Sequence, residues 1–463
     1  MCGVAGWLGP GGYGSVYRLL LEQQHRGHDA AGAAWPREGR VEAIGGPGLV
    51  FQALPGSAPA PEGAPVIGHV RYSTSGGYQG SQPVTGPRGL VAVAFNGNIV
   101  NFREAVAEVA GAGAASSVSW DAEALALVVE ELLAGHGSLA DAVREAAGLL
   151  VGAYSLVAVS ARGELVAARD PLGVRPLAYS LGDGYAAVAS ETGALNAMGL
   201  AARELAAGGM LYCPEPRPEG CSLERLAPAA PEPLPCAFEY IYLLRPDSVF
   251  EGVNAHAARR RMGALLARMD PLEPDVVAPV PDSGRSAALG YAEEKGARLE
   301  EVLYVNRFAG RAFISSPGER ARRLSMKYSL IPGTVEGRRV ALVDDSIVRG
   351  DTGRRLSSLI RSGGAREVHL RSAAPPVVSP CFFGVDIPTR RELIAYGRRA
   401  DEIARILGFD SVLYNTVRNL EAAVGRRLCM GCFTGIYPYR LDVDSLEEVF
   451  GYSRRGAYGE VRG

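Results

Sequence analysis

The sequence predicts two domains of different fold class: an α+β domain of layered sheets and helices, followed by an α/β domain with a parallel, doubly wound sheet. Three observations predict this. The chain has 463 residues, and a single hydrophobic core stops growing at roughly 250–300 residues. Short strand-like runs dominate the first half, whereas strand-like and helix-forming runs alternate in the second. Seven of the thirty prolines lie between Cys213 and Cys236, which predicts an interdomain connection there. We therefore expect domains over residues 2–230 and 231–463.

In the first half, apolar runs bounded by Gly, Pro, Asn or Asp predict strands over residues 65–73, 89–97, 153–160 and 164–170. Apolar residues at helical spacing predict helices from Val16 to Gln24 and from Asp121 to Ala134. The longest uncharged apolar stretch runs from Ala146 to Ala161. It is shorter than the roughly 18 residues that span a bilayer, and we expect it to form two buried strands.

In the second half, strands are predicted over residues 275–284, 301–307, 339–346 and 367–376. Each run is followed by loop residues and often by a helix-forming stretch, the alternation of a parallel sheet. In such sheets, ligands bind beyond the carboxyl ends of the strands. Candidate binding residues are therefore sought at those ends.

The composition excludes some classes of partner. Forty-eight Lys and Arg balance fifty Asp and Glu to a net charge of -2, so no global field recruits nucleic acid or an anionic membrane. The first residues lack the basic segment and cleavage site of a signal peptide, and we expect a cytoplasmic protein. The seven cysteines are scattered and odd in number, which favours metal or catalytic use over a disulfide framework.

A candidate phosphate site lies over residues 340–352, VALVDDSIVRGDT, where a buried strand ends in two acids and a small-residue loop opens a helix. Backbone N–H groups at a helix N-terminus bind phosphate. Asp344 and Asp345 would repel phosphate, so they suit ribose hydroxyls or Mg²⁺. An acid pair that only caps a helix is the alternative. The phosphate-loop candidates are Ser346, Arg349, Gly350 and Thr352.

A second strand end, over residues 280–288, offers Asp282, Ser283 and Gly284. The glycine permits close backbone approach to another anionic group, and Ser283 is expected to share Mg²⁺ with Asp344 and Asp345. Further on, a basic run is expected to form a mobile loop that closes over the diphosphate, with a solvated basic face as the alternative. This run comprises Arg320, Arg322, Arg323 and Lys327.

The segment VALVDDSIVRGDT resembles the phosphoribosyl diphosphate motif of type I phosphoribosyltransferases, and its length makes the resemblance specific. The resemblance implies an α/β phosphoribosyltransferase domain in the second half. It also implies that Asp344 and Asp345 bind the ribose of phosphoribosyl diphosphate.

The first half offers a nucleophile at its start. We expect Met1 to be removed, which would leave Cys2 with a free α-amine of pKa about 7.7–8.0 beside a thiol of pKa about 8.5. Nucleophile and base would then belong to one residue. The motifs MCGVAGWLG, QHRGHDAAG, GHVRYSTSG, FNGN and WDAE follow in order, and this order resembles class II glutamine amidotransferases. The resemblance implies an N-terminal nucleophile hydrolase domain, a layered αββα sandwich.

Each candidate residue of this first site has a chemical task. The guanidinium of Arg71 suits the glutamine carboxylate as a bidentate clamp, and Asp121 suits the glutamine amino group. The tetrahedral oxyanion that thiolate attack creates needs fixed donors. The Asn96 side chain and the Gly97 backbone are the candidates for that task.

With both halves considered, the chain resembles the glutamine phosphoribosyldiphosphate amidotransferase family over nearly its whole length. The resemblance implies glutamine hydrolysis at Cys2 and attack of the ammonia on phosphoribosyl diphosphate, to give 5-phosphoribosylamine in the first step of purine synthesis. It also implies Mg²⁺, an apolar ammonia channel, inhibition by purine nucleotides, and a homodimer or homotetramer.

Cys236, Cys381 and the CxxC pair Cys429 and Cys432 are candidate metal ligands. Four thiolates suit zinc or an iron–sulfur cluster, and spacing alone leaves both open beside inert buried cysteines. One branch of the family carries a [4Fe–4S] cluster in matching cysteine contexts, which implies that cluster here. Cys213 and Cys221 match no ligand and are either free thiols or a loop disulfide.

Four positions depart from the family pattern: Phe95 replaces a His, His28 stands where Gln is commoner, Val305 replaces a Lys and Asp351 a Thr. They bear on affinity more than on reaction type. A sensor of phosphoribosyl diphosphate that binds nucleic acid is one rival function, but it would not need Cys2 or Arg71. A different class II amidotransferase would lack the VALVDDSIVRGDT segment. An inactive paralogue would be expected to lack Cys2 or one of the paired acids.

Overall fold

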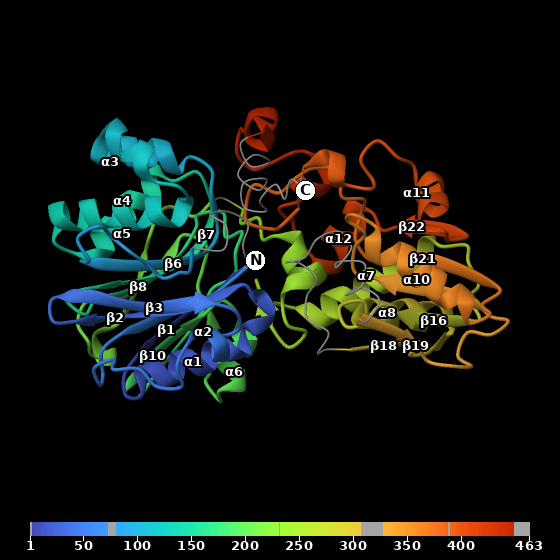
Figure 1. Ribbon diagram of the computed structural model, residues 1–463, viewed down its shortest axis with the longest axis horizontal. Helices are drawn as coiled ribbons and strands as arrows, with labels where there is room; N and C mark the ends of the chain where they lie inside the picture. The colour runs from blue at the N-terminus through green and yellow to red at the C-terminus, as the bar shows by residue number, and fades with distance from the viewer. Residues whose placement is uncertain (1, 73–79, 231, 307–326, 388, 449–463) are drawn as a thin grey trace, which may run out of the picture.

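The computed structural model describes residues 2–72, 80–230, 232–306, 327–387 and 389–448. Two halves lie side by side, and the N-terminus lies where they meet (Figure 1). Within the described residues, no helix has the length and apolar character needed to cross a membrane. Three of the four residues of the basic run, Arg320, Arg322 and Arg323, lie outside the described residues.

Two antiparallel sheets form the centre of the first half. In spatial order, one comprises β11 (Arg203–Glu204), β9 (Ala178–Gly182), β10 (Tyr185–Ala189), β1 (Gly3–Leu8), β4 (Val66–Arg71), β2 (Ala30–Arg37) and β3 (Arg40–Pro47). The other comprises β13 (Ser222–Arg225), β12 (Gly209–Cys213), β8 (Leu165–Arg169), β7 (Gly152–Ser160), β6 (Val91–Ile99) and β5 (Val84–Thr85). Apolar side chains from both sheets, such as Val4 and Val157, form one core between them.

Helices cover the outer face of each sheet (Figure 1). On the seven-stranded sheet lie α1 (Gly12–Glu22), α2 (Val50–Ala53) and α6 (Thr192–Ala197). On the six-stranded sheet lie α3 (Phe102–Ser117), α4 (Asp121–His136) and α5 (Leu139–Leu149). The layers run helix, sheet, sheet, helix, so the layered αββα sandwich predicted for the first half is confirmed.

The expectation of two buried strands between Ala146 and Ala161 is wrong in its first part. Ala146 and Ala147 belong to α5, and only β7 is a strand. A short apolar run has the same composition in a buried helix face and in a buried strand. The upstream cap decides here, since the Ser138 side chain accepts a hydrogen bond from the Asp141 N–H and starts a helix.

The second half contains a five-stranded parallel sheet. Its order is β17 (Arg298–Leu299), β16 (Val276–Pro279), β20 (Arg339–Asp344), β21 (Glu367–Ser372) and β22 (Ser411–Tyr414). One face packs on α7 (Ala255–Met269), α8 (Arg285–Lys295) and α12 (Val417–Val424), and the other on α10 (Asp351–Ser362) and α11 (Ala400–Leu407). The predicted doubly wound α/β fold is confirmed.

The predicted strand over residues 301–307 does not join this sheet. Its central part, β18 (Leu303–Val305), pairs antiparallel with β19 (Tyr328–Leu330) in a separate two-stranded sheet. Tyr304 is 59% exposed, so the run buries one face only, whereas strands inside a doubly wound sheet are covered on both faces. β17 takes the edge position beside β16 instead.

Near the end of the first half, Cys213 and Cys221 form a disulfide across the hairpin of β12 and β13, so the disulfide is the correct one of the two states that the sequence left open. The short helix η2 (Pro218–Gly220) lies inside this hairpin. Next come a π-helical turn, η3 (Glu239–Leu243), and a small hairpin of β14 (Val249–Phe250) and β15 (Val253–Asn254). The boundary between residues 230 and 231 stays a prediction.

Candidate active sites

The candidate nucleophile lies at the start of β1, beside the end of β4. The Cys2 Sγ is 3.7 Å from the carbonyl oxygen of Tyr72. Arg71, the last residue of β4, is buried, and its guanidinium stacks on the Trp120 ring at 4.3 Å. Burial lowers the pKa of Arg71, although the charges of Cys2 and Asp121 oppose this. Cys2 and Asp121 therefore both lie within electrostatic range of Arg71.

Asp121 connects the first helix turn of α4 to the end of β6. One of its carboxylate oxygens accepts a hydrogen bond from the Ile99 N–H at 3.3 Å, and the side chain is buried. Its position in the first turn of α4 places it at the positive end of the helix dipole. A negative charge beside Arg71 makes this site suited to a zwitterionic amino acid.

Asn96 and Gly97 lie in β6, which packs across β1. The Asn96 side chain is fully buried, and neither its amide nitrogen nor its oxygen has a hydrogen-bond partner among the described residues. Such a group costs free energy unless something else pairs with it. At Gly97 the φ angle is 151°, and a Cβ there would overlap the Ala153 carbonyl. The Asn96 amide is therefore available to a bound ligand.

The second site gathers the carboxyl ends of β16 and β20. The Ser283 hydroxyl donates to one oxygen of Asp345, and the Ser346 hydroxyl donates to the other at 2.6 Å. The Asp345 N–H donates to the Asp344 side chain at 2.9 Å. Gly284 begins α8 so close to β20 that a Cβ would lie 2.5 Å from the Val343 carbonyl. Ser283 and Asp344 are 61 positions apart in the sequence, yet both line one end of the sheet.

Both acids of this pair carry a raised pKa. For Asp344, burial and the neighbouring Asp345 raise the pKa well above its ordinary range. For Asp345, burial raises the pKa against the hydrogen bonds from Ser283 and Ser346. Two adjacent buried carboxylates are costly to ionise together, and a divalent cation or hydroxyl donors would relieve that cost. Oxygen ligands of this kind suit Mg²⁺.

The loop after the acids leads into α10. Gly350 precedes the helix with a φ of 87°, and a Cβ there would lie 2.6 Å from the Ile394 side chain. Thr352 lies in the first turn, and Arg349 pairs with Glu392 at 3.3 Å. At the other strand end, Asp282 pairs with Arg285 at 3.3 Å. Open backbone N–H groups at the start of a twelve-residue helix suit a phosphate.

The four candidate ligand cysteines lie in one apolar region. Cys236 and Cys429 face each other across a β-bridge, and Cys432 is buried beside them in α13 (Gly431–Thr434). The Cys381 sulfur accepts a hydrogen bond from the Phe383 N–H at 3.4 Å. Burial raises the pKa of Cys236 to about 11 despite a nearby arginine. Burial, Cys236 and Cys381 also raise the pKa of Cys429.

Within the described part of the chain, no group of three or more His, Cys, Asp or Glu side chains is arranged as a metal-ion site. The four thiols are nevertheless close enough for their charges to interact with one another. The donor set is all sulfur, and aromatic rings surround it, with Phe238 and Phe433 stacked at 5.3 Å. This chemistry fits a soft metal centre.

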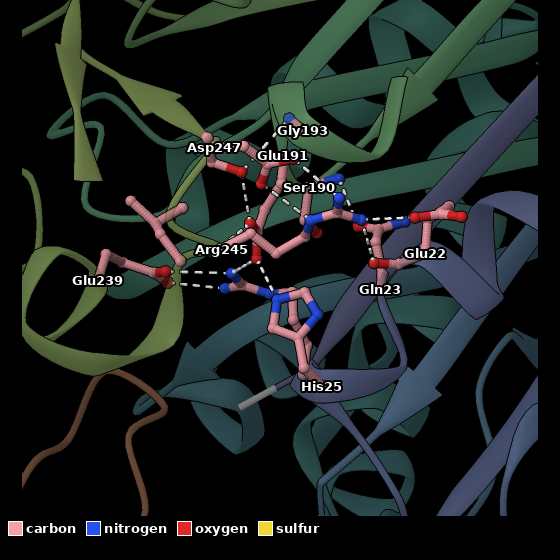
Figure 2. Close-up of polar contacts among 12 residues, drawn as sticks. Glu22, Gln23, His25, Ser190, Glu191, Gly193, Glu239, Arg245 and Asp247 are labelled. Carbon is pink, nitrogen blue, oxygen red and sulfur yellow. Dashed lines mark hydrogen bonds and ion pairs between the residues drawn. The ribbon is translucent and has the colours of Figure 1, made fainter. Parts of the chain in front are cut away.

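A buried charge network that the sequence did not predict joins the two halves. Figure 2 shows His25, Glu191, Glu239 and Arg245 converging on one group of polar contacts. The Glu191 side chain accepts hydrogen bonds from the Arg245 N–H at 2.8 Å and from the Ser248 hydroxyl at 2.7 Å. Although burial alone would raise the pKa of Glu191, His25 and Arg26 hold it well below its ordinary range. The only sequence signal was the placement of charged residues among apolar runs.

Three of the departures from the family pattern, Phe95, Val305 and Asp351, have separate structural settings. Phe95 is buried in the core under α4, and its N–H donates to Gln82 at 2.8 Å. Val305 ends β18 and is half-buried. Asp351 begins α10 and is exposed, so solvent screens its charge.

The fold and these two sets of residues define a class of protein: a glutamine amidotransferase of the N-terminal nucleophile type joined to a phosphoribosyltransferase domain. A family model described as a glutamine amidotransferase domain matches residues 69–197. Similarity over almost the full length is more specific, and by it the chain belongs to the amidophosphoribosyltransferase family.

Two relatives and two solved structures illustrate this similarity. The chain is 38% identical to an amidophosphoribosyltransferase of Bacillus subtilis, over 96% of this chain and 95% of that protein. It is 40% identical to one of Pyrococcus horikoshii, over 94% and 96%. The chain is also similar to a solved structure of the glutamine phosphoribosylpyrophosphate amidotransferase from B. subtilis, complexed with ADP and GMP. The match covers 97% of this chain and 100% of the solved chain, with a TM-score of 0.85 and 37% identity. For a second solved structure, described as the allosteric regulatory enzyme of purine biosynthesis, the match covers 97% of this chain and 99% of the solved chain, with a TM-score of 0.86 and 38% identity.

Proposed function

We propose that the chain hydrolyses glutamine at Cys2 and transfers the ammonia to 5-phosphoribosyl 1-diphosphate, the first step of purine synthesis. The products are 5-phosphoribosylamine, glutamate and diphosphate. One observation carries the proposal. The chain is similar to amidophosphoribosyltransferases over nearly its full length, and in one half it has Cys2 near Arg71, which is also near Asp121. In the other half it places Ser283 beside Asp345.

The glutamine reaction follows from the first set of residues. Arg71 binds the substrate carboxylate and Asp121 binds its amino group, which presents the side-chain amide to Cys2. The thiol proton passes to the α-amine, the thiolate attacks the amide carbon, and ammonia leaves as a thioester forms. Asn96 and the Gly97 N–H stabilise the oxyanion. Water then hydrolyses the thioester to glutamate.

The transfer reaction follows from the second set. Asp344 and Asp345 orient the ribose, and the Ser346–Thr352 loop, with Arg349 and Gly350, binds its phosphate. Asp282, Ser283 and Gly284 border the diphosphate. Ammonia attacks the anomeric carbon as the bond to the diphosphate oxygen breaks. Mg²⁺ held by Asp344, Asp345 and Ser283 would supply charge neutralisation for that leaving group.

Nucleotide regulation, assembly and location complete the proposal. The B. subtilis relative was solved with ADP and GMP, and we propose purine nucleotides as inhibitors of this chain. A homodimer or homotetramer, an apolar ammonia channel and a cytoplasmic location are proposed from the family resemblance.

The function predicts coupled products. Given glutamine, Mg²⁺ and phosphoribosyl diphosphate, the purified protein should release glutamate and diphosphate in a ratio of about one to one, and free ammonia should replace glutamine. Both products are measured in the same reaction. A protein that releases no diphosphate with either nitrogen source would be better described as a sensor or an inactive paralogue.

We further propose that the chain belongs to the iron–sulfur branch, with Cys236, Cys381, Cys429 and Cys432 as ligands of a [4Fe–4S] cluster. Support comes from the shared apolar environment of the four thiols and from their all-sulfur donor set. Burial raises the pKa of Cys236, Cys429 and Cys432, and cluster formation would release their thiol protons.

Metal analysis tests this assignment. Anaerobically purified protein should contain about four iron and four sulfide per chain, and Cys429→Ser should reduce both to below about a quarter of that. Cys213→Ser is the matched control, because Cys213 lies in the disulfide and not among the four thiols, and it should retain the cluster. About one zinc per chain without sulfide would instead identify a zinc site.

A further inference from the structure

A single buried arginine connects the backbone of the nucleophile to the other half of the protein. The Arg26 Nε donates to the carbonyl oxygen of Cys2 at 2.9 Å. Its two terminal nitrogens donate to the two carboxylate oxygens of Glu239, at 2.8 and 3.1 Å. This is the bidentate geometry in which guanidinium and carboxylate orient each other most strictly. One side chain thus holds both the nucleophile residue and a carboxylate of the phosphoribosyltransferase half.

Burial makes this contact unusual. Neither Arg26 nor Glu239 has any exposed side-chain surface, and Arg26 also donates to Glu191 at 2.6 Å. Removing two charges from water costs about as much as their attraction returns, so a buried ion pair is a weak device for stability alone. Orientation of the groups that the pair touches is the better explanation for it.

The carbonyl of Cys2 controls where the nucleophile lies. Strand pairing of β1 with β4 begins only at Gly3, opposite Val70, so the Cys2 peptide lies beyond the ladder. After removal of Met1, that peptide would be the only covalent tether of the α-amine and the thiol. A hydrogen bond to its carbonyl therefore fixes both reacting groups at once.

Glu239 is itself held by a helix of the phosphoribosyltransferase half. It begins η3, and the carbonyls of that turn accept hydrogen bonds from Arg259 of α7: Tyr240 at 2.6 Å and Leu244 at 2.7 Å. The Arg259 side chain is buried, and its charge interacts with that of Asp345. Hydrogen bonds therefore connect Arg259 to Cys2 through the η3 turn, Glu239 and Arg26, and an electrostatic interaction connects Arg259 to Asp345.

We propose that Arg26 and Glu239 are positioning residues through which the phosphoribosyltransferase half places Cys2 for attack on glutamine. The proposal rests on the function proposed for Cys2. When the contact is weakened, the thiol and amine are displaced while the phosphoribosyl site keeps its own residues. Ground-state binding of glutamine depends on Arg71 and Asp121, which lie on other elements, at the end of β4 and in the first turn of α4.

The variant Glu239→Gln tests this proposal, because the substituted side chain keeps the shape of glutamate but not its negative charge. Displacement of about 1 Å can reduce a rate by about 100-fold, so we expect the glutamine-dependent kcat to fall by roughly 10- to 100-fold with KM within about 3-fold. Ammonia-dependent turnover should stay within about 2-fold. The matched control is Glu22→Gln, since Glu22 also pairs with an arginine of the other half, Arg245, at 2.5 Å. All its parameters should match the wild type.

A second measurement separates positioning from general damage. Labelling of Cys2 by a diazoketone analogue of glutamine should slow in Glu239→Gln as much as kcat does, whereas alkylation by iodoacetamide should not slow. If the single variant does not fold, Arg26→Gln/Glu239→Gln removes both charges together and undergoes the same assays. If both fold, the double variant should lose no more activity than Arg26→Gln alone, because Glu239 reaches Cys2 through Arg26.

Two results would overturn the proposal. If the glutamine-dependent kcat is unchanged in the variants, Cys2 is positioned without this contact. Equal loss of glutamine- and ammonia-dependent turnover would show a general structural role. If the wild type itself does not use glutamine or ammonia, the proposed function fails rather than the connection.

Discussion

Cys2→Ala is expected to lose glutamine-dependent activity by at least about 10⁴-fold while keeping ammonia-dependent release of diphosphate within about 3-fold of the wild type. The thiol supplies the bond that splits amide hydrolysis into two steps, and no other cysteine lies in that site among the described residues. The phosphoribosyl site lies in a different sheet system with its own donors. Initial rates with each nitrogen source measure both effects.

Two controls make this result specific. The diazoketone analogue of glutamine should label wild-type protein once per chain, at Cys2, and should not label Cys2→Ala. Intact mass should show that Met1 is absent, because a retained methionine would block the α-amine. Loss of ammonia-dependent turnover in Cys2→Ala would contradict the division of the reaction between two sites.

Asp344→Asn is expected to reduce diphosphate release by at least about 100-fold with glutamine and with ammonia alike. An amide cannot neutralise Mg²⁺, and it replaces an acceptor of ribose hydroxyls with a partial donor. Asp275→Asn is the matched control: Asp275 is an exposed acid before the amino end of β16, at the opposite end of the same sheet. Its turnover should remain within about 2-fold of the wild type. Normal ammonia-dependent turnover in Asp344→Asn would remove Asp344 from the site.

The same substitution should stabilise the ligand-free protein at neutral pH. The folded-state pKa of Asp344 is raised by burial and by Asp345. Its contribution to stability is therefore complete below the ordinary aspartate pKa, about 3.9, and is lost as pH rises through the raised value. Asp344→Asn avoids that loss, so its free energy of unfolding should exceed that of the wild type near pH 7. The excess should shrink toward pH 4. Urea unfolding at both pH values measures this, and equal stability at pH 7 would contradict the raised pKa.

The parts of the fold that depend on local pattern were predictable. Strands such as β7 and β20 bury both faces, and their apolar runs end in turn residues that mark their limits. The apolar run that begins at Ala146 was not predictable, since the side chain of Ser138 upstream made a helix of its first residues. β18 was also not predictable as a separate sheet, because pairing with β19 depends on chain that follows it.

The sequence by itself determined the two domain classes and the chemical identity of both candidate sites, because short motifs carry their own donors, acceptors and turns. Only the tertiary structure decided which distant groups meet. Arg26 and Glu239 are 213 positions apart, and no local pattern specifies that pairing. The disulfide of Cys213 with Cys221 was likewise one of two states that spacing allowed. Charges buried between domains find their partners through packing of whole sheets, a long-range property that a pattern of neighbouring residues does not encode.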